Sequence, residues 1–146
     1  MDKPRVLFLC TGNTARSQIA EALLRNRAGD RFEVHSAGLE PSEVRPETLT
    51  VLGEAGISAE GLRSKNVTEY LGKVHISYLI TVCQSAEEHC PRAWPVGGRR
   101  LFWSISDPAR VQGSQAERLD AFRRARDEIG RHIDAWLAEH GEPAHI

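Results

Sequence analysis

A continuous apolar run that ends in a cysteine most constrains how this chain can fold. Residues 6–9 read Val-Leu-Phe-Leu, and Cys10 follows directly. An uninterrupted run of this kind is typical of a strand buried on both faces, as in a parallel sheet. After Arg16, apolar residues recur among polar ones at Ile19, Ala22 and Leu23, which predicts an amphipathic helix. The segment from Cys10 to Arg16 should therefore join the end of a buried strand to the start of a helix.

A loop in that position is well suited to hold an anion. Backbone N–H groups at a helix start lack partners within the helix, and the helix dipole adds positive potential. Both effects predict a lowered pKa for the Cys10 thiol, so that a thiolate exists near neutral pH. The planar guanidinium of Arg16 can bind two oxygens of a tetrahedral anion. Alone, Cys10 would be read as a small core residue; the full pattern favours an oxyanion loop made of Thr11, Gly12, Asn13, Thr14, Ala15, Arg16 and Ser17.

Length and composition narrow the class of protein. A chain of 146 residues predicts one domain, spanning residues 1–146. The net charge of −1 gives no broad basic surface for nucleic acid. No apolar run approaches the ~20 residues of a membrane span, and the N-terminus has no signal-peptide core. We therefore expect a cytoplasmic protein with no nucleic-acid or membrane partner. Three cysteines fit poorly with purely structural disulfides and favour catalytic or redox use.

The hydrophobic pattern predicts alternating strands and helices. Strands are expected at residues 6–9, 32–38, 76–82 and 101–103. Helices are expected at 17–28, 47–55 and 85–90, with one turn near 67–71. A long final helix should follow Ser114 and stop at Gly141 and Pro143. Its apolar residues recur at spacings of three and four and predict one core-facing stripe: Leu119, Phe122, Ala125, Ile129, Ile133 and Trp136. Ser85 with Glu88, and Ser114 with Glu117, have the spacing of capping boxes.

This order predicts an α/β fold with three layers: a four-stranded parallel sheet with helices on both faces. Ligands of such sheets bind beyond the carboxyl ends of the strands. Cys10, Cys83 and Asp107 each lie just past a predicted strand end. We therefore expect all three side chains at one rim of the sheet, where the Asp107 carboxyl group could protonate a leaving oxygen.

These residues resemble a known superfamily. Cys10 to Ser17, followed by Gln-Ile-Ala-Glu-Ala, is similar to the phosphate loop of low-molecular-weight protein tyrosine phosphatases and of arsenate reductases built on the same fold. Thr81-Val82-Cys83, Cys90-Pro91 and Asp107-Pro108 are similar to the thioredoxin-coupled arsenate reductases, so the resemblance covers nearly the whole chain. Phosphatases of this fold usually carry a tyrosine near the Asp-Pro pair, whereas Ala109 and Arg110 follow it here.

The resemblance implies an arsenate reductase active in arsenic detoxification. Cys10 would attack arsenate held by the loop and Arg16, while Ser17 stabilises the thiolate and Asp107 protonates the departing oxygen. Cys83 would then form a Cys10–Cys83 disulfide, and Cys90 a Cys83–Cys90 disulfide that thioredoxin reduces. It implies no bound cofactor, with phosphate or sulfate as competing oxyanions; we expect a monomer. A helix between Cys83 and Cys90 would separate their Cα atoms by roughly 10 Å. A disulfide spans only about 4.4–6.8 Å, so that helix would have to unwind.

Other interpretations remain at this point. The main alternative is a phosphatase that hydrolyses phosphate monoesters with Cys10, Arg16 and Asp107; residual activity of this kind would accompany the reductase. A third interpretation is a non-enzymatic anion-binding module, which would not need Cys10, Arg16 and Asp107 together. Independently of these alternatives, Cys83 and Cys90 could be two buried structural thiols. A zinc site with His89 lacks the usual ligand spacing.

The resemblance also raises the question of whether this chain binds a potassium ion. Some members of the family bind potassium beneath the loop, and the matching positions here are Asn13, Glu21 and Ser36. The fourth position holds Asn66 rather than an aspartate, with Lys65 beside it. A missing carboxylate and a nearby ammonium both weaken a cation site, so we expect no metal. Asn13 has a second expected role, since asparagine tolerates the left-handed conformation that such a loop requires.

Overall fold

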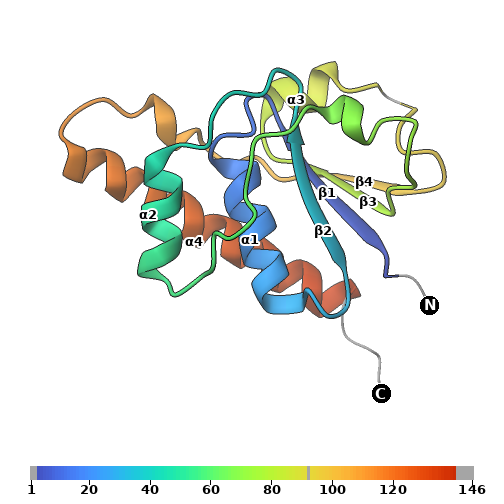
Figure 1. Cartoon of the computed structure of the whole chain (residues 1–146), viewed down its shortest axis with the longest axis horizontal. Helices are drawn as coiled ribbons and strands as arrows, with labels where there is room; N and C mark the ends of the chain where they lie inside the picture. Colours follow the sequence, from blue (N-terminus) through green and yellow to red (C-terminus); the bar gives the residue numbers. More distant parts are fainter. Residues whose placement is uncertain (1–2, 92, 141–146) are drawn as a thin grey trace.

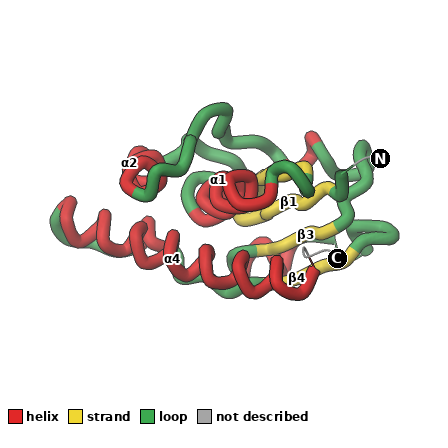
Figure 2. The backbone as a smooth tube through the Cα atoms, turned by 90° about the horizontal axis from the view of Figure 1, so that it is seen from below, coloured by secondary structure: helices red, strands yellow, loops and turns green. Residues whose placement is uncertain are grey.

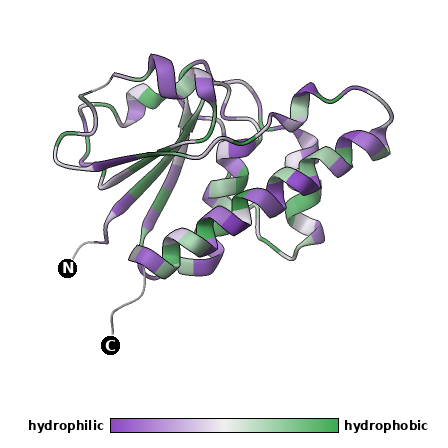
Figure 3. Cartoon of the chain, turned by 180° about the vertical axis from the view of Figure 1, so that it is seen from behind, coloured by the Kyte–Doolittle hydropathy of each residue, from purple (hydrophilic) through white to green (hydrophobic). Residues whose placement is uncertain are grey.

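The structure is a computed structural model that describes residues 3–91 and 93–140. Its elements are β1 (Arg5–Cys10), α1 (Arg16–Ala28), β2 (Glu33–Gly38), α2 (Pro46–Glu54), the 3-10 helix η1 (Val67–Glu69), β3 (Tyr78–Thr81), α3 (Gln84–His89), β4 (Arg99–Phe102), the 3-10 helix η2 (Pro108–Arg110) and α4 (Gln115–His140). The strands form one parallel sheet in the order β2-β1-β3-β4. Figures 1 and 3 show α1, α2 and α4 on one side of this sheet and α3 with η1 on the other. The predicted three-layer α/β fold is confirmed.

β1 is the centre of the sheet. It pairs in parallel with β2 on one side and with β3 on the other. Residues 6–9 are completely buried, because both faces of the strand are covered. The interpretation of this apolar run as a doubly covered strand is therefore confirmed, and Cys10 ends the strand inside the protein.

α4 supplies much of the cover on one face. Its predicted apolar stripe is buried at Phe122, Ala125, Ile129, Ile133 and Trp136, and Leu119 packs against the core at partial burial. In Figure 3, green and purple residues alternate along this helix, as expected for an amphipathic element. Figure 2 shows α4 running along one edge of the molecule beneath α1.

The predicted capping box of α4 is confirmed. The backbone N–H of Glu117 donates to Ser114 Oγ at 3.1 Å, and the N–H of Ser114 donates to Glu117 Oε1 at 2.8 Å. The predicted stop at Gly141 and Pro143 lies outside the described residues. None of the described helices has the length and apolar character needed to cross a membrane.

Several predicted boundaries differ by one or two residues; β3, for example, spans Tyr78–Thr81 rather than 76–82. Two of the differences have identifiable reasons. The chain leaves β3 in an extended conformation through Cys83, so Cys83 rather than Ser85 caps α3. Cys83 Sγ accepts from the backbone N–H of Ala86 at 3.4 Å, and the helix begins at Gln84. β4 begins at Arg99, two residues before the expected start, because an outer strand with a partner on one side can carry charged side chains.

Gly38, the last residue of β2, touches the loop that follows β1. A Cβ atom at this position would lie 2.5 Å from the carbonyl oxygen of Thr11 and 3.0 Å from the backbone nitrogen of Asn13. Glycine is therefore needed for close approach of two backbones.

We predict that Gly38→Ala lowers the free energy of unfolding by about 1–3 kcal/mol, because the added methyl overpacks a backbone contact. Gly53→Ala is the matched control, because a Cβ there meets no atom within 4 Å and the position lies in α2. That variant should gain about 0.5–1 kcal/mol from helix propensity. Urea denaturation measures both, and equal effects of the two substitutions would contradict the close contact.

Candidate active site

The loop from Cys10 to Arg16 wraps its backbone around the cysteine sulfur. Cys10 Sγ accepts from the backbone N–H of Asn13 at 3.2 Å and lies 2.9 Å from Ser17 Oγ. Asn13 has a φ of 53°, so its predicted left-handed conformation is confirmed. This conformation turns the Asn13 N–H toward the sulfur. The amide Nδ2 of Asn13 also donates to Ser17 Oγ at 2.8 Å, which leaves the Ser17 hydroxyl proton free to point at Cys10.

A neighbouring segment holds the loop from outside. The carbonyl oxygen of Asn13 accepts from Gln18 Nε2 at 3.0 Å and from Ser64 Oγ at 2.9 Å. Asn13 Oδ1 accepts from the backbone N–H of Lys65 at 2.8 Å. Because Asn13 is completely buried, each of these bonds satisfies a polar group that water cannot reach.

The predicted lowering of the Cys10 pKa is wrong in direction, because the structure buries the sulfur. Burial raises the pKa of the Cys10 thiol above its ordinary value, and the nearby Cys83 adds to this. The hydrogen bond from Ser17, the charge of Arg16 and the N–H of Asn13 lower the pKa, but they do not offset burial. The sequence pattern predicted donors around the sulfur. It did not show how deeply Cys10 would be buried: the residue is only 3 % exposed in the structure.

Arg16 and Asp107 meet above the loop. Arg16, the first residue of α1, donates from Nη1 to the carbonyl oxygen of Ile105 at 2.9 Å. Its Nη2 lies 3.5 Å from Asp107 Oδ2. Asp107 Oδ1 accepts from the backbone N–H of Ala109 at 3.0 Å, so the carboxylate also caps η2. The two side chains therefore face the same space, as the sequence predicts.

The space between them is a cavity of about 1040 Å³ at the carboxyl ends of the strands. Cys10, Arg16, Cys83 and Asp107 all line it. Cys83 Sγ lies 3.5 Å from Thr11 Oγ1, at the edge of the loop. The expected gathering of Cys10, Cys83 and Asp107 at one rim is thus what the structure shows.

Cys90 lies apart from this group. It follows α3, is only 2 % exposed, and is not among the described residues that line the cavity. Burial raises the pKa of its thiol, while Arg100 lowers it. All three cysteines are free thiols in this structure.

The sequence analysis missed several residues of the cavity. Arg45 lines it from the position before α2, and its backbone N–H donates to the carbonyl oxygen of Thr14 at 3.0 Å. Ser42 also lines it and donates its N–H to Gly12 O at 2.9 Å. Pro46 was a usable signal, because a proline in the first turn marks Arg45 as the residue that precedes the helix.

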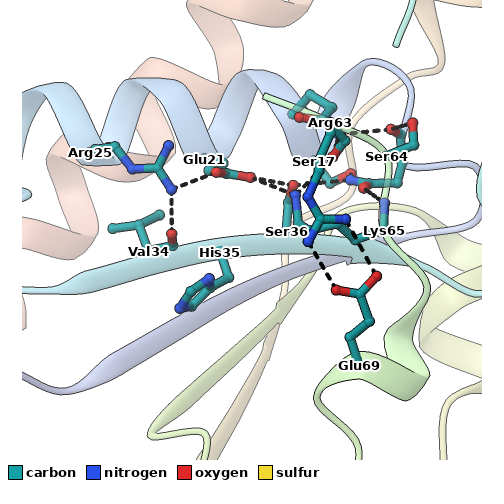
Figure 4. Close-up of polar contacts among 12 residues, drawn as sticks. Ser17, Glu21, Arg25, Val34, His35, Ser36, Arg63, Ser64, Lys65 and Glu69 are labelled. Carbon is teal, nitrogen blue, oxygen red and sulfur yellow. Dashed lines mark hydrogen bonds and ion pairs between the residues drawn. The ribbon is translucent and has the colours of Figure 1, made fainter. Parts of the chain in front are cut away.

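Two cationic side chains of the protein, Arg25 and Lys65, contact Glu21, the carboxylate of the matched potassium positions (Figure 4). Glu21 Oε1 accepts from Ser36 Oγ at 2.5 Å and lies 3.4 Å from Lys65 Nζ. Glu21 Oε2 accepts from Arg25 at 2.5 Å. Burial lowers the pKa of Lys65, and the Glu21 carboxylate opposes this. The Asn66 side chain turns away and accepts from the backbone N–H of Thr68.

Among the described residues, no three or more histidine, cysteine, aspartate or glutamate side chains gather in a group that could hold a metal ion.

We predict that Ser17→Ala slows alkylation of Cys10 at neutral pH by roughly tenfold, because a hydrogen bond to a charged group is worth about 1.5–3 kcal/mol. The rate should rise with pH in both proteins, since only the thiolate reacts. The variant profile should lie at higher pH, because Ser17 lowers the pKa of Cys10. Mass spectrometry of the Cys10 peptide gives the rates, with Ser106→Ala, which changes another cavity residue, as control. Superimposable profiles for Ser17→Ala and the parent would refute this role.

We also predict that potassium does not stabilise the protein specifically, because Lys65 and Arg25 already neutralise Glu21. The measurement is the melting temperature in potassium and in sodium chloride at matched ionic strength. A ligand that binds the folded state raises this temperature with concentration. A rise of several degrees confined to potassium would contradict the prediction.

Comparisons with known proteins agree with this geometry. The family model described as low molecular weight phosphotyrosine protein phosphatase matches residues 5–143. An arsenate reductase of Halalkalibacterium halodurans is 38% identical over 143 residues, which cover 97% of this chain and 100% of that protein. A solved arsenate reductase in its phosphate-binding state has a TM-score of 0.78 at 25% identity, covering 93% of this chain and 98% of the other.

A thioredoxin-dependent arsenate reductase of Corynebacterium glutamicum has a TM-score of 0.65 at 31% identity and covers 92% of this chain and 63% of the other. The matched region includes all of the loop, the strands and the rim described above. The chain therefore belongs to the low molecular weight phosphotyrosine protein phosphatase family.

Proposed function

We propose that this protein is an arsenate reductase that uses Cys10, Cys83 and Cys90 as a thiol relay and is recycled by thioredoxin. The observation that carries the proposal is a second free thiol, Cys83, at the rim of the cavity that holds the nucleophile Cys10. A hydrolase needs one cysteine in this position. A reductase needs a second thiol, because two thiols together supply the two electrons that reduce arsenate. The arsenate reductases related over nearly the whole chain support the same activity.

The first half of the reaction uses the loop. Backbone N–H groups of the loop and the Arg16 fork bind the oxyanion. The Cys10 thiolate attacks arsenic and one oxygen departs, with its proton supplied by Asp107. A dianion in the loop would compete with the thiolate for the same donors, so the Ser17 hydroxyl, which contacts the sulfur from below, has the task of stabilising it.

The second half reduces arsenic. Cys83 attacks Cys10 Sγ, the sulfur–arsenic bond breaks, and its electron pair leaves with arsenite. The product is a Cys10–Cys83 disulfide, so two thiols supply the two electrons. Cys90 then attacks Cys83, Cys10 departs as a thiolate, and a Cys83–Cys90 disulfide remains for thioredoxin to reduce. No resident cofactor is needed, because the electrons reach the protein through thiol exchange.

The partners follow from this chemistry. Arsenate is the substrate, and phosphate or sulfate compete with it because they share its shape and charge. The phosphate-binding state of a related reductase supports this competition. The thioredoxin-dependent relative supports thioredoxin as the reductant. We propose a cytoplasmic monomer, since three free thiols suit a reducing compartment.

A second candidate is hydrolysis of phosphate monoesters by Cys10, Arg16 and Asp107, which meet at one cavity. The family description supports this chemistry. The residues that follow Asp107 do not favour it as the main activity, because Ala109 and the exposed Arg110 provide no aromatic surface to grip a phosphotyrosine ring. We therefore propose phosphatase action as a side activity.

The deciding experiment follows NADPH oxidation and arsenite release with thioredoxin and thioredoxin reductase, beside hydrolysis of p-nitrophenyl phosphate. Arsenite release that depends on thioredoxin is the expected result. Efficient ester hydrolysis without arsenate reduction would establish the phosphatase instead.

We predict that two cysteine substitutions separate the activities. Cys10→Ser should abolish both, because a serine with no adjacent base is a poor nucleophile. Cys83→Ser should stop arsenate turnover but leave ester hydrolysis within about twofold, because only the reductase needs a second thiol. Steady-state rates of both reactions measure this. Arsenate reduction at the parent rate by Cys83→Ser would mean that an external thiol resolves the Cys10 adduct.

A further inference from the structure

Arg100 makes an unusual set of contacts beneath the segment that joins Cys83 to Cys90. It lies on β4 opposite Leu79 of β3, and its side chain is 19% exposed. Its Nη2 donates to the carbonyl oxygen of Glu87 at 2.9 Å and of Cys90 at 3.5 Å. Its Nη1 donates to the carbonyl oxygen of Pro91 at 2.7 Å and of Trp94 at 3.3 Å. One guanidinium therefore binds four carbonyl groups at the end of α3 and in the turn that follows.

The remaining N–H of Arg100 has a partner on the same helix. Arg100 Nε lies 3.5 Å from Glu87 Oε1. That carboxylate oxygen also accepts from the buried Thr81 Oγ1 at 2.7 Å, which links the helix to β3. Both terminal nitrogens of Arg100 therefore donate to carbonyl groups of α3 and the turn after it, and Nε adds an ion-pair contact with Glu87.

The contacts of Arg100 with the carbonyl groups of Glu87 and Cys90 depend on the helical conformation of α3. Seven residues at helical rise place the Cα atoms of Cys83 and Cys90 roughly 10 Å apart. A disulfide requires about 4.4–6.8 Å. The carbonyl groups of Glu87 and Cys90 must therefore move when these cysteines join, and the guanidinium must release them.

We propose that Arg100 is a positioning residue for the thiol relay, which holds α3 and the following turn in the reduced conformation with Cys90 buried. The inference rests on the proposed function, because the relay supplies the Cys83–Cys90 disulfide. In that step the Cys90 thiolate attacks Cys83 Sγ, the Cys10–Cys83 bond breaks, and Cys10 leaves as a thiolate. The Cys90 proton passes to solvent, and the exchange involves no net oxidation.

The position of Arg100 has two consequences for Cys90. The contacts keep the thiol buried and away from the cavity until the helix opens, so stray oxidants do not reach it. The positive charge near the sulfur favours the thiolate, although burial dominates and keeps the pKa of the thiol raised. Reactivity therefore develops when the turn is released and burial is lost.

The test uses the redox equilibrium of Cys83 and Cys90 in a full-length Cys10→Ser protein, where these are the only thiols. The protein is equilibrated with reduced and oxidised dithiothreitol, and free thiols are counted by alkylation and mass spectrometry. Because Arg100 stabilises the dithiol form, Arg100→Gln should favour the disulfide by about tenfold. This corresponds to a midpoint potential about 30 mV more negative.

Hydrogen exchange of reduced protein gives a second measurement. The amides of residues 84–90 should exchange at least tenfold faster in Arg100→Gln than in the parent, while β1 and β3 remain protected. Arg100→Lys keeps a positive charge at the site, so this variant should remain folded. The lysine ammonium cannot bind four carbonyl groups as the guanidinium does. It should change both measurements in the same direction as Arg100→Gln. Full restoration by lysine would overturn the role of the guanidinium fork.

Arg99→Gln is the matched control, because it removes the same charge from the neighbouring, exposed position of β4. It should leave the potential and the exchange of 84–90 unchanged. If the parent forms the Cys83–Cys90 disulfide but the Arg100 variants have the same midpoint potential as the parent, the positioning role of Arg100 is wrong and the relay stands. A parent that forms no such disulfide would overturn the relay and, with it, this role.

Discussion

The pairing of β1 with a neighbour on each side is the constraint on which the active site depends. Strand pairing on both edges and helix cover on both faces bury residues 6–9 of β1 completely, and Cys10 at the end of the strand is almost as deeply buried. The loop there must turn back within a few residues to start α1. This forces the backbone around Cys10 Sγ, and the left-handed Asn13 makes the turn with its own N–H aimed at the sulfur. The nucleophile and its donors therefore come from one folding requirement.

Burial of the sulfur and the polar groups around it act in opposite directions. Loss of water disfavours the thiolate, while Ser17, Arg16 and Asn13 favour it. Asn13 donates to both Ser17 and Ser36, and Ser36 in turn donates to Glu21, so a hydrogen-bonded network holds Asn13 and Ser17 in place. Figure 4 shows Ser17, Ser36 and Glu21 of this network. Lys65 supplies a cation to the same network from a neighbouring segment. These contacts restrict the conformations of the loop, which limits the reorganisation that oxyanion binding requires.

The sequence predicted those parts of the molecule that local pattern determines. The apolar run of β1, the stripe of α4 and the Ser114–Glu117 cap follow from spacing alone, and so does the rim that gathers Cys10, Cys83 and Asp107. Features set by tertiary contact were not predictable. Ser85 had the residue type of a cap, but the path of the chain out of β3 gave that role to Cys83. The direction of the Cys10 pKa depended on burial, and the role of Arg100 depended on which carbonyl groups β4 faces.

Cys83 both caps α3 and lines the cavity that holds Cys10, and this links the two disulfide steps of the proposed relay. Its sulfur accepts the N–H of Ala86 and so completes the first turn of α3. Under the proposed relay, this sulfur must turn toward Cys10 to release arsenite, and the Ala86 N–H then loses its acceptor. The helix then loses this capping bond at one end at the moment when its other end has to open. Release of arsenite would therefore weaken the helix that the next disulfide exchange must unwind. An enzyme that has not met its substrate keeps the Cys83 cap.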